Sequence, residues 1–169
     1  MSTYYIDEKV FSKKDKYFVY DIENKKVSQI TENAFAGVFD RIFGSVFSIG
    51  HKLCINNLEG KEEFILKKRA GGVCPRYDLI VDNSIKATIK RDRKWIKPRY
   101  NVWGDYGTYL IEGDILGKKF NVKKDGIIYG RIDKKDFSLN DIYEICTYKN
   151  GRYELFISIT LAIDNSIHN

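Results

Sequence analysis

The sequence predicts a mainly β fold in which short strands, joined by turns, enclose a helix at the C-terminus. Two observations support this prediction. Aromatic residues reach 14% of the chain, with 12 tyrosines and 10 phenylalanines, and such residues favour strands. The segment 153–164 is apolar on nearly every side, so it has to be enclosed by protein or by lipid. A helix sealed inside a β-structure satisfies both observations.

The C-terminal segment is the first element to place. A helix needs about 20 residues to span a bilayer, and 153–164 is far shorter, so burial in protein is predicted. The alternation of Leu155, Ile157, Ile159 and Leu161 leaves open a segment that begins as a strand and becomes helical after about Ile159. The residues expected to be buried in the helix are Leu155, Phe156, Ile159, Leu161, Ala162 and Ile163.

Hairpin signals recur through the rest of the chain. Residues 85–90 alternate strictly between apolar and polar, as a half-buried strand does. Asp125-Gly126 and Asn150-Gly151 supply the positive φ angles that tight hairpins require. About ten to twelve strands result, at the spacing of a barrel or a sandwich. The expected strands include 17–20, 27–30, 52–55, 63–66, 77–81, 85–90, 109–112, 119–123, 127–132 and 142–148.

One segment interrupts the hairpins and is predicted to form an extra short helix near residues 33–46. Its apolar residues follow helical spacing, and they are Phe35, Val38, Phe39, Ile42, Phe43 and Val46. Two places for this helix stay open. It either plugs one end of the β-structure, or it presents its phenylalanines to a membrane or a protein partner.

Length and composition predict a single domain, 1–169. A net charge of +6 permits attraction to nucleic acid or anionic membrane without requiring either. Cys54, Cys74 and Cys146 are odd in number and form no C-x-x-C pattern, which argues against a disulfide framework or a cysteine zinc site. The N-terminus lacks the pattern of a signal peptide, and no transmembrane segment is expected. We therefore expect a cytoplasmic location, with peripheral membrane attachment as an extension of it.

Residues for catalysis are hard to assemble from this sequence. The two histidines are His51, beside a lysine near a predicted strand, and His168, the penultimate residue. No G-x-S-x-G, P-loop or H-E-x-x-H motif occurs. Asp105, Glu112 and Asp114 lie close together in Gly-rich turns, but they lack EF-hand spacing. We therefore predict a protein that is not an enzyme, with no catalytic residue, no metal and no cofactor.

The densest basic run spans residues 90–100, with six cations and two aromatic residues among eleven. If the run forms a strand, Arg91, Arg93 and Trp95 share one face, and 67–69 extends the patch if the hairpins are neighbours. Anionic lipid attracts such a run. The alternative is a solvated hairpin with Trp95 in the core. The candidate residues for binding anionic head groups are Lys90, Arg91, Arg93, Lys94, Trp95, Lys97 and Arg99.

Several motifs in order resemble those of the LURP-one-related family, of the tubby C-terminal-like superfamily that includes phospholipid scramblases. They are Tyr5-Ile6 through Tyr17–Asp21, Phe47–Leu53, Pro75-Arg76-Tyr77 with Lys97–Tyr100, Glu112–Gly117 and Leu161–Asp164. The resemblance covers nearly the whole chain. It implies a closed tubby-like barrel of about twelve strands around a hydrophobic C-terminal helix, without exposed sheet edges. The extra segment 33–46 departs from the family pattern.

The resemblance and the basic run together suggest a function at membranes. Tubby domains bind phosphoinositide head groups through basic residues, and scramblases act at membranes, although no lipid ligand of tubby can be matched to a position here. We expect peripheral recognition of anionic phospholipid or of an acidic protein surface. The alternative is a protein-interaction scaffold that uses the 33–46 helix. Nucleic-acid binding is less favoured, and the oligomeric state is left open.

Overall fold

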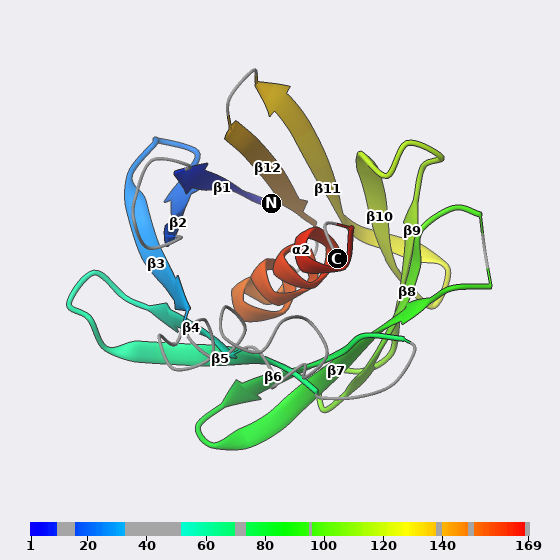
Figure 1. The fold of residues 1–169 in the computed structure, drawn as a ribbon, viewed down its shortest axis with the longest axis horizontal. Helices are drawn as coiled ribbons and strands as arrows, with labels where there is room; N and C mark the ends of the chain where they lie inside the picture. The colour runs from blue at the N-terminus through cyan, green and yellow to red at the C-terminus, as the bar shows by residue number, and fades with distance from the viewer. Residues whose placement is uncertain are drawn as a thin grey trace, which may run out of the picture.

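The predicted closed barrel is confirmed in the computed structural model, which describes residues 1–9, 16–32, 52–69, 74–94, 96–137, 140–148 and 151–167. Neighbouring strands are antiparallel and follow chain order, and one helix fills the middle of the barrel (Figure 1). The strands are β1 Ser2–Lys9, β2 Lys16–Asp21, β3 Lys26–Glu32, β4 Lys52–Asn56, β5 Glu62–Lys68, β6 Arg76–Val81, β7 Ser84–Asp92, β8 Arg99–Gly104, β9 Tyr109–Gly113, β10 Lys119–Lys124, β11 Ile127–Phe137 and β12 Asn140–Thr147.

The alternation predicted for residues 85–90 sets the faces of β7. Ala87 and Ile89 lie in the core, while the side chain of Lys90 is only partly buried. Tight turns connect such strands where residues tolerate positive φ. Asp125 and Gly126 have φ angles of 50° and 76°, as the Asp-Gly signal predicted. The pattern predicts the inward side at Ala87 and Ile89 and the turn at Asp125-Gly126, but Ile85 at the start of β7 is 52% exposed, next to a register shift between β6 and β7.

The barrel closes between the first and last strands. β1 pairs with β12 from Ser2↔Thr147 to Asp7↔Ile142. Because every strand of the barrel has a partner on both sides, the sheet has no free edge.

Helix α2, Tyr153–Ile167, occupies the interior of the barrel. It is helical from Tyr153, so the alternative of a strand before Ile159 is wrong. The reason is enclosure on every side: a helix satisfies its own backbone hydrogen bonds, whereas a lone strand inside a closed barrel would have no partner strand. All six residues predicted to be buried in this helix are at most 3% exposed.

The barrel has two different ends. Connections after odd-numbered strands lie at one end, which we call the loop end, and connections after even-numbered strands lie at the other, the turn end. The C-terminal end of α2 lies at the loop end, because Asn165 accepts a hydrogen bond from Lys68, the last residue of β5. The predicted helix near residues 33–46 lies outside the described residues, between β3 and β4.

Candidate functional site

The basic run forms the connection between β7 and β8. β7 ends at Asp92 and β8 begins at Arg99, so the run does not form one continuous strand, and the condition under which Arg91, Arg93 and Trp95 would share one face is not met. The chain turns because the backbone N–H of Lys94 donates to Asp92 Oδ1 at 3.0 Å, a local bond that competes with strand pairing. Pro98, just before β8, has no N–H to donate to a sheet.

Arg91 points into the mouth of the barrel. It follows Ala87 and Ile89 on the inward face of β7, and its guanidinium Nη1 donates to the backbone carbonyl of Ser166 near the C-terminal end of α2. A cation at this end of a helix is favoured by the helix dipole. The structure therefore brings Arg91 to the helix end and separates it from the exposed cations of the same run.

The outer part of the connection is exposed. Arg93, Lys94 and Lys97 are all exposed, and Ile96 between them is 96% exposed. Among the described residues, no carboxylate forms an ion pair with these three cations. Lys90 and Arg99 are partly buried at the foot of the connection. Trp95 lies outside the described residues, so its place at a membrane interface or in the core stays a prediction.

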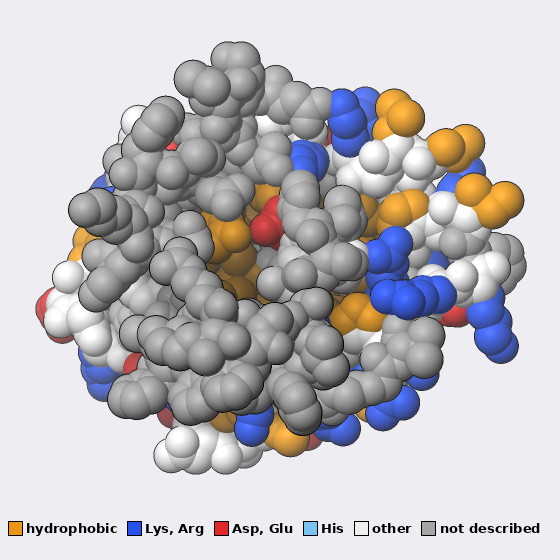
Figure 2. Space-filling view, viewed as in Figure 1, with side chains coloured by type: hydrophobic (Ala, Val, Ile, Leu, Met, Phe, Trp, Pro, Cys, Tyr) orange, Lys and Arg blue, Asp and Glu red, His pale blue; other side chains and the backbone are white. Residues whose placement is uncertain are grey.

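A second connection, 114–118 between β9 and β10, lies beside the first. The backbone N–H of Gly113 donates to the carbonyl of Pro98 at 2.8 Å and joins the two. Ile115 and Leu116 in this connection are 71% and 76% exposed. Figure 2 shows hydrophobic and basic side chains next to each other along this part of the loop end. We call Arg93, Lys94, Ile96, Lys97, Ile115 and Leu116 the basic tip.

The carboxylates nearest the basic tip already have partners. Lys123 Nζ lies 2.7 Å from Glu112 Oε2, and this hydrogen bond lowers the pKa of Glu112, with further help from Arg99 and Lys97. Burial by itself would raise the pKa of Asp114, but hydrogen bonds from backbone N–H groups, first that of Lys118, lower it overall. Both carboxylates thus stay charged near neutral pH. Lys97 is attracted to Glu112, whereas Arg93 and Lys94 face the solvent.

A second polar group, which the sequence did not reveal, surrounds the C-terminal end of α2. Tyr143 Oη donates to Asp164 Oδ1 at 2.7 Å, and Tyr77 Oη donates to Asn165 Oδ1 at 3.0 Å. The hydroxyls of Tyr100 and Ser166 lie 2.6 Å apart. Each tyrosine comes from a different strand, so no local sequence pattern could indicate the group. It closes the helix end with hydrogen bonds and fixes its position in the barrel.

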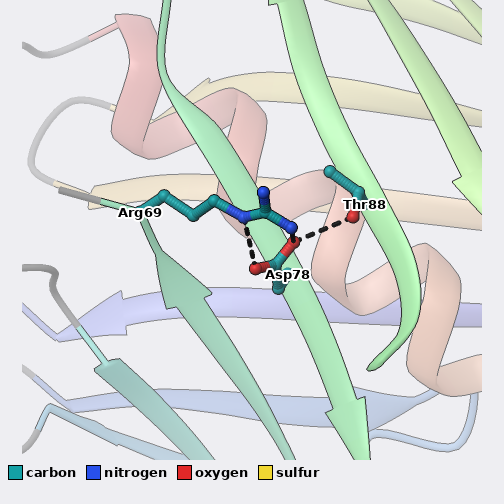
Figure 3. A network of polar contacts seen from close by, with 3 residues as sticks. All are labelled: Arg69, Asp78 and Thr88. Atoms are coloured by element: carbon teal, nitrogen blue, oxygen red, sulfur yellow. Dashed lines mark hydrogen bonds and ion pairs between the residues drawn. The ribbon is translucent and has the colours of Figure 1, made fainter. Parts of the chain in front are cut away.

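The expected contribution of 67–69 to the basic patch is not seen for two of its residues. Arg69 binds Asp78 through two nitrogens, with Nε to Oδ2 at 2.6 Å and Nη2 to Oδ1 at 2.9 Å, and Thr88 Oγ1 donates to Oδ1 at 2.8 Å (Figure 3). The hydrogen bond to Asp78 raises the pKa of Arg69. Lys68 is bound to Asn165. These contacts fix the start of the connection after β5.

A groove runs along the outside of β2, β1, β12 and β11, away from the basic run. Its volume is about 720 Å³. We call it the outer groove, and its described lining consists of Tyr5, Asp7, Tyr20, Asp21, Ile22, Asn24, Lys135, Ile142 and Glu144. Sequence analysis did not identify it, because its residues come from separate parts of the chain.

A closed twelve-stranded barrel filled by one helix defines the tubby-like class of fold. The model of the LURP-one-related family matches residues 2–164, so the chain belongs to that family. It is 20% identical to the uncharacterized protein YxjI of Bacillus subtilis (strain 168) over 165 residues, 98% of this chain and 93% of that protein. The X-ray structure of an Arabidopsis thaliana protein superposes with a TM-score of 0.61 at 15% identity, over 97% and 92% of the two chains. The predicted family and fold are thereby confirmed.

Proposed function

We propose that this domain binds anionic phospholipid head groups at a membrane surface, without catalysing a reaction, and that the basic tip makes the contact. The main supporting observation is the side chain of Ile96, 96% exposed between the exposed cations Lys94 and Lys97. An isoleucine on a projecting connection is not needed for packing. The flanking cations would be attracted to anionic lipid, and this attraction would bring Ile96 into contact with the membrane interface. No helix in the described part of the chain is long and apolar enough to cross a bilayer.

Two kinds of attraction act together at the basic tip. Each basic side chain near an anionic surface contributes about 1 kcal/mol, and burying one isoleucine side chain contributes about 1.5–3 kcal/mol. Three cations and Ile96 therefore contribute comparable amounts, and Ile115 and Leu116 on the adjacent connection enlarge the apolar part. Binding at a membrane interface strengthens with buried apolar area and with attraction to anionic lipid, and the basic tip offers both.

The charge of the connections differs between the two ends of the barrel. The connection 93–98 carries three cations and no acid, whereas the turns at the other end mix acids such as Asp82, Asp105 and Asp125 with cations such as Lys25 and Lys61. An anionic surface would therefore orient the domain with its loop end toward the membrane.

Vesicle co-sedimentation tests the proposal. We expect the full chain to pellet with vesicles of phosphatidylcholine mixed with phosphatidylserine and to stay in solution with phosphatidylcholine alone. Added salt should weaken the binding without abolishing it, because the apolar part is not screened. Equal pelleting with both vesicle types, or none with either, would overturn the proposal. Binding to short oligonucleotides that exceeds vesicle binding would point to nucleic acid as the partner.

Matched charge reversals locate the contact surface. The double change Arg93→Glu with Lys94→Glu should weaken vesicle binding by more than about tenfold, since each basic group contributes about 1 kcal/mol and each acid is repelled. The control, Lys25→Glu with Lys61→Glu, makes the same charge change on exposed residues at the turn end. It should retain most of the binding.

Ile96→Ser tests the apolar part at unchanged charge. Weaker vesicle binding with an unchanged melting temperature would support insertion of Ile96. If Ile96→Ser binds like the wild type, the contact is purely electrostatic, and an acidic protein surface becomes the better partner.

A further inference from the structure

The outer groove lies on the outside of the barrel wall. Tyr5 and Asp7 of β1 point to this side, opposite the core residue Ile6. Glu144 of β12 lies opposite Tyr5 in the strand register, and Ile142 lies opposite Asp7. The volume of about 720 Å³ falls within the range of about 300–1,000 Å³ typical of small-molecule sites.

Asp7 leaves a hydrogen-bond acceptor unused in this groove. Its Oδ1 is buried and has no hydrogen-bond partner, although the side chain lines the groove. Native proteins pair most of their buried polar atoms, so an unpaired carboxylate oxygen is unusual. The Asp7 side chain is partly exposed where it lines the groove, and a cation bound there would offset its charge.

The other charged groups of the groove are already engaged. Lys135 Nζ lies 3.0 Å from Glu144 Oε2, so these two charges offset each other. Asp21 Oδ1 accepts the backbone N–H groups of Glu23 and Lys25. Among the described lining residues, Lys135 is the only cation. The groove as a whole is therefore acidic, on a protein whose net charge is +6.

The rest of the lining suits an organic cation better than a bare metal ion. Tyr5 and Tyr20 lie opposite each other in the register of β1 and β2, and aromatic rings attract ammonium groups through their faces. Ile22 and Ile142 offer apolar surface to a hydrocarbon chain. Lys135 already places one alkylammonium group against Glu144 in this groove.

From these contacts we infer that the outer groove binds an alkylammonium group, carried by a small organic amine or by a lysine side chain, with Asp7 as the carboxylate that receives it. The tyrosines contact the cation and the isoleucines contact its methylene chain. The inference is independent of the membrane contact, because the groove and the basic tip share no residue.

Calorimetric titration of the full chain tests this inference with two probes, spermidine and Nα-acetyl-lysine methylamide. Saturable binding of either probe is expected, and the tighter of the two identifies the source of the amine. Magnesium chloride at matched ionic strength should not compete. Absence of binding by both probes, or equal competition by magnesium, would overturn the inference.

Three variants make the test specific. Asp7→Asn should weaken binding of the better probe by about tenfold, a change of about 1.4 kcal/mol. The control Asp125→Asn makes the same chemical change in an exposed turn at positive φ, where asparagine is tolerated. It should bind like the wild type. Tyr20→Leu keeps all charges and should also weaken binding; wild-type affinity in both groove variants would contradict the proposed site.

Discussion

Single residues decide how closely the barrel wall can approach the central helix. Gly130 on β11 lies against the ring of Phe156 of α2. A Cβ at this position would overlap the ring and would lie 2.5 Å from the carbonyl oxygen of Cys146. Neither neighbour is free to move, because Phe156 is fully buried and Cys146 belongs to a paired strand.

Gly130→Ala is therefore expected to destabilise the fold. Overpacking of a tight core costs about 1–3 kcal/mol, and urea unfolding measures it. Gly126→Ala serves as a comparison, since the Cβ there meets nothing within 4 Å and only the φ of +76° is unfavourable. If Gly130→Ala unfolded at the same urea concentration as the wild type, the close packing described for Phe156 would be wrong.

Ser158 shows the opposite case, a residue whose side chain is poorly matched to its place. It lies in the middle of α2, is fully buried, and its Oγ has no hydrogen-bond partner in the described structure. A buried hydroxyl without a partner costs about 1–3 kcal/mol. Alanine removes that hydroxyl and has the higher helix propensity.

Ser158→Ala should therefore stabilise the protein by about 1 kcal/mol. A higher melting temperature in calorimetry is the expected result. Thr160→Val is the informative control, because Thr160 Oγ1 donates to the carbonyl of Phe156 at 2.9 Å, so its removal should give no comparable gain. A lower melting temperature for Ser158→Ala would mean that the hydroxyl has a partner after all.

At the scale of elements, α2 depends on the strands around it at both ends. Near its start, Tyr153 Oη donates to Ser28 Oγ at 2.8 Å. Near its end, Arg91 and Tyr100 bind Ser166. The last turn of α2 contains no basic residue, so the cations that complement the helix dipole come from the barrel wall, Arg91 from β7 and Lys68 from β5. The residues that bind the C-terminal end of the helix are thus remote from it in sequence.

Replacing Arg91 tests this arrangement. Arg91→Ala removes a charged donor from a helix-end carbonyl, and hydrogen bonds to charged groups contribute about 1.5–3 kcal/mol. The adjacent Lys90→Ala, on the other face of β7, should change the free energy of unfolding by less than about 0.5 kcal/mol. Equal effects of the two substitutions in urea unfolding would contradict the inward placement of Arg91.

The elements themselves could largely be predicted from the sequence, because their signals are local. Alternation identified strands such as β7, and Asp125-Gly126 identified a turn. The basic run shows the limit of local patterns. Alternation left a strand and a hairpin both open, and the turn at Asp92 and Lys94 ends the strand. Charge alone could not show that Arg91 binds the C-terminal end of α2 while Arg93 faces the solvent.

The whole molecule reveals what no local pattern could. The outer groove and the tyrosines around the end of α2 each draw on several strands, and only the barrel brings them together. The closing pair β1–β12 joins residues from opposite ends of the chain. Closure was therefore predicted through the family resemblance, whereas alternation allowed either a barrel or a sandwich.

The buried tyrosines predict sensitivity of the whole fold to alkali. Burial raises the pKa of Tyr77 and of Tyr153 well above the ordinary value of 10.0, and burial, followed by the hydrogen bond to Glu154, raises that of Tyr106 to about 12. Unfolded tyrosines lose their protons near 10.0, while the folded protein keeps them. The stability from these groups is thus complete below that pH and is lost as the pH rises above it.

Urea unfolding at about pH 9 and about pH 11 measures this loss. The wild type should lose stability between the two, and the double variant Tyr77→Phe with Tyr153→Phe should lose less. For each protein, the comparison uses the change in free energy of unfolding between the two pH values. A variant that is less stable at both pH values therefore does not affect the comparison. An equal loss in both proteins would mean that these tyrosines do not titrate on unfolding.

The pairing of the first strand with the last has a consequence for synthesis on the ribosome. β1 emerges before the other strands, but β12 and α2, which give it a neighbour and fill the interior, are made after β11. Until then the nascent chain holds an unfilled sheet with two open edges, which invite pairing with other chains. The barrel thus cannot close until β12 has been made, and its interior is not filled until α2 follows.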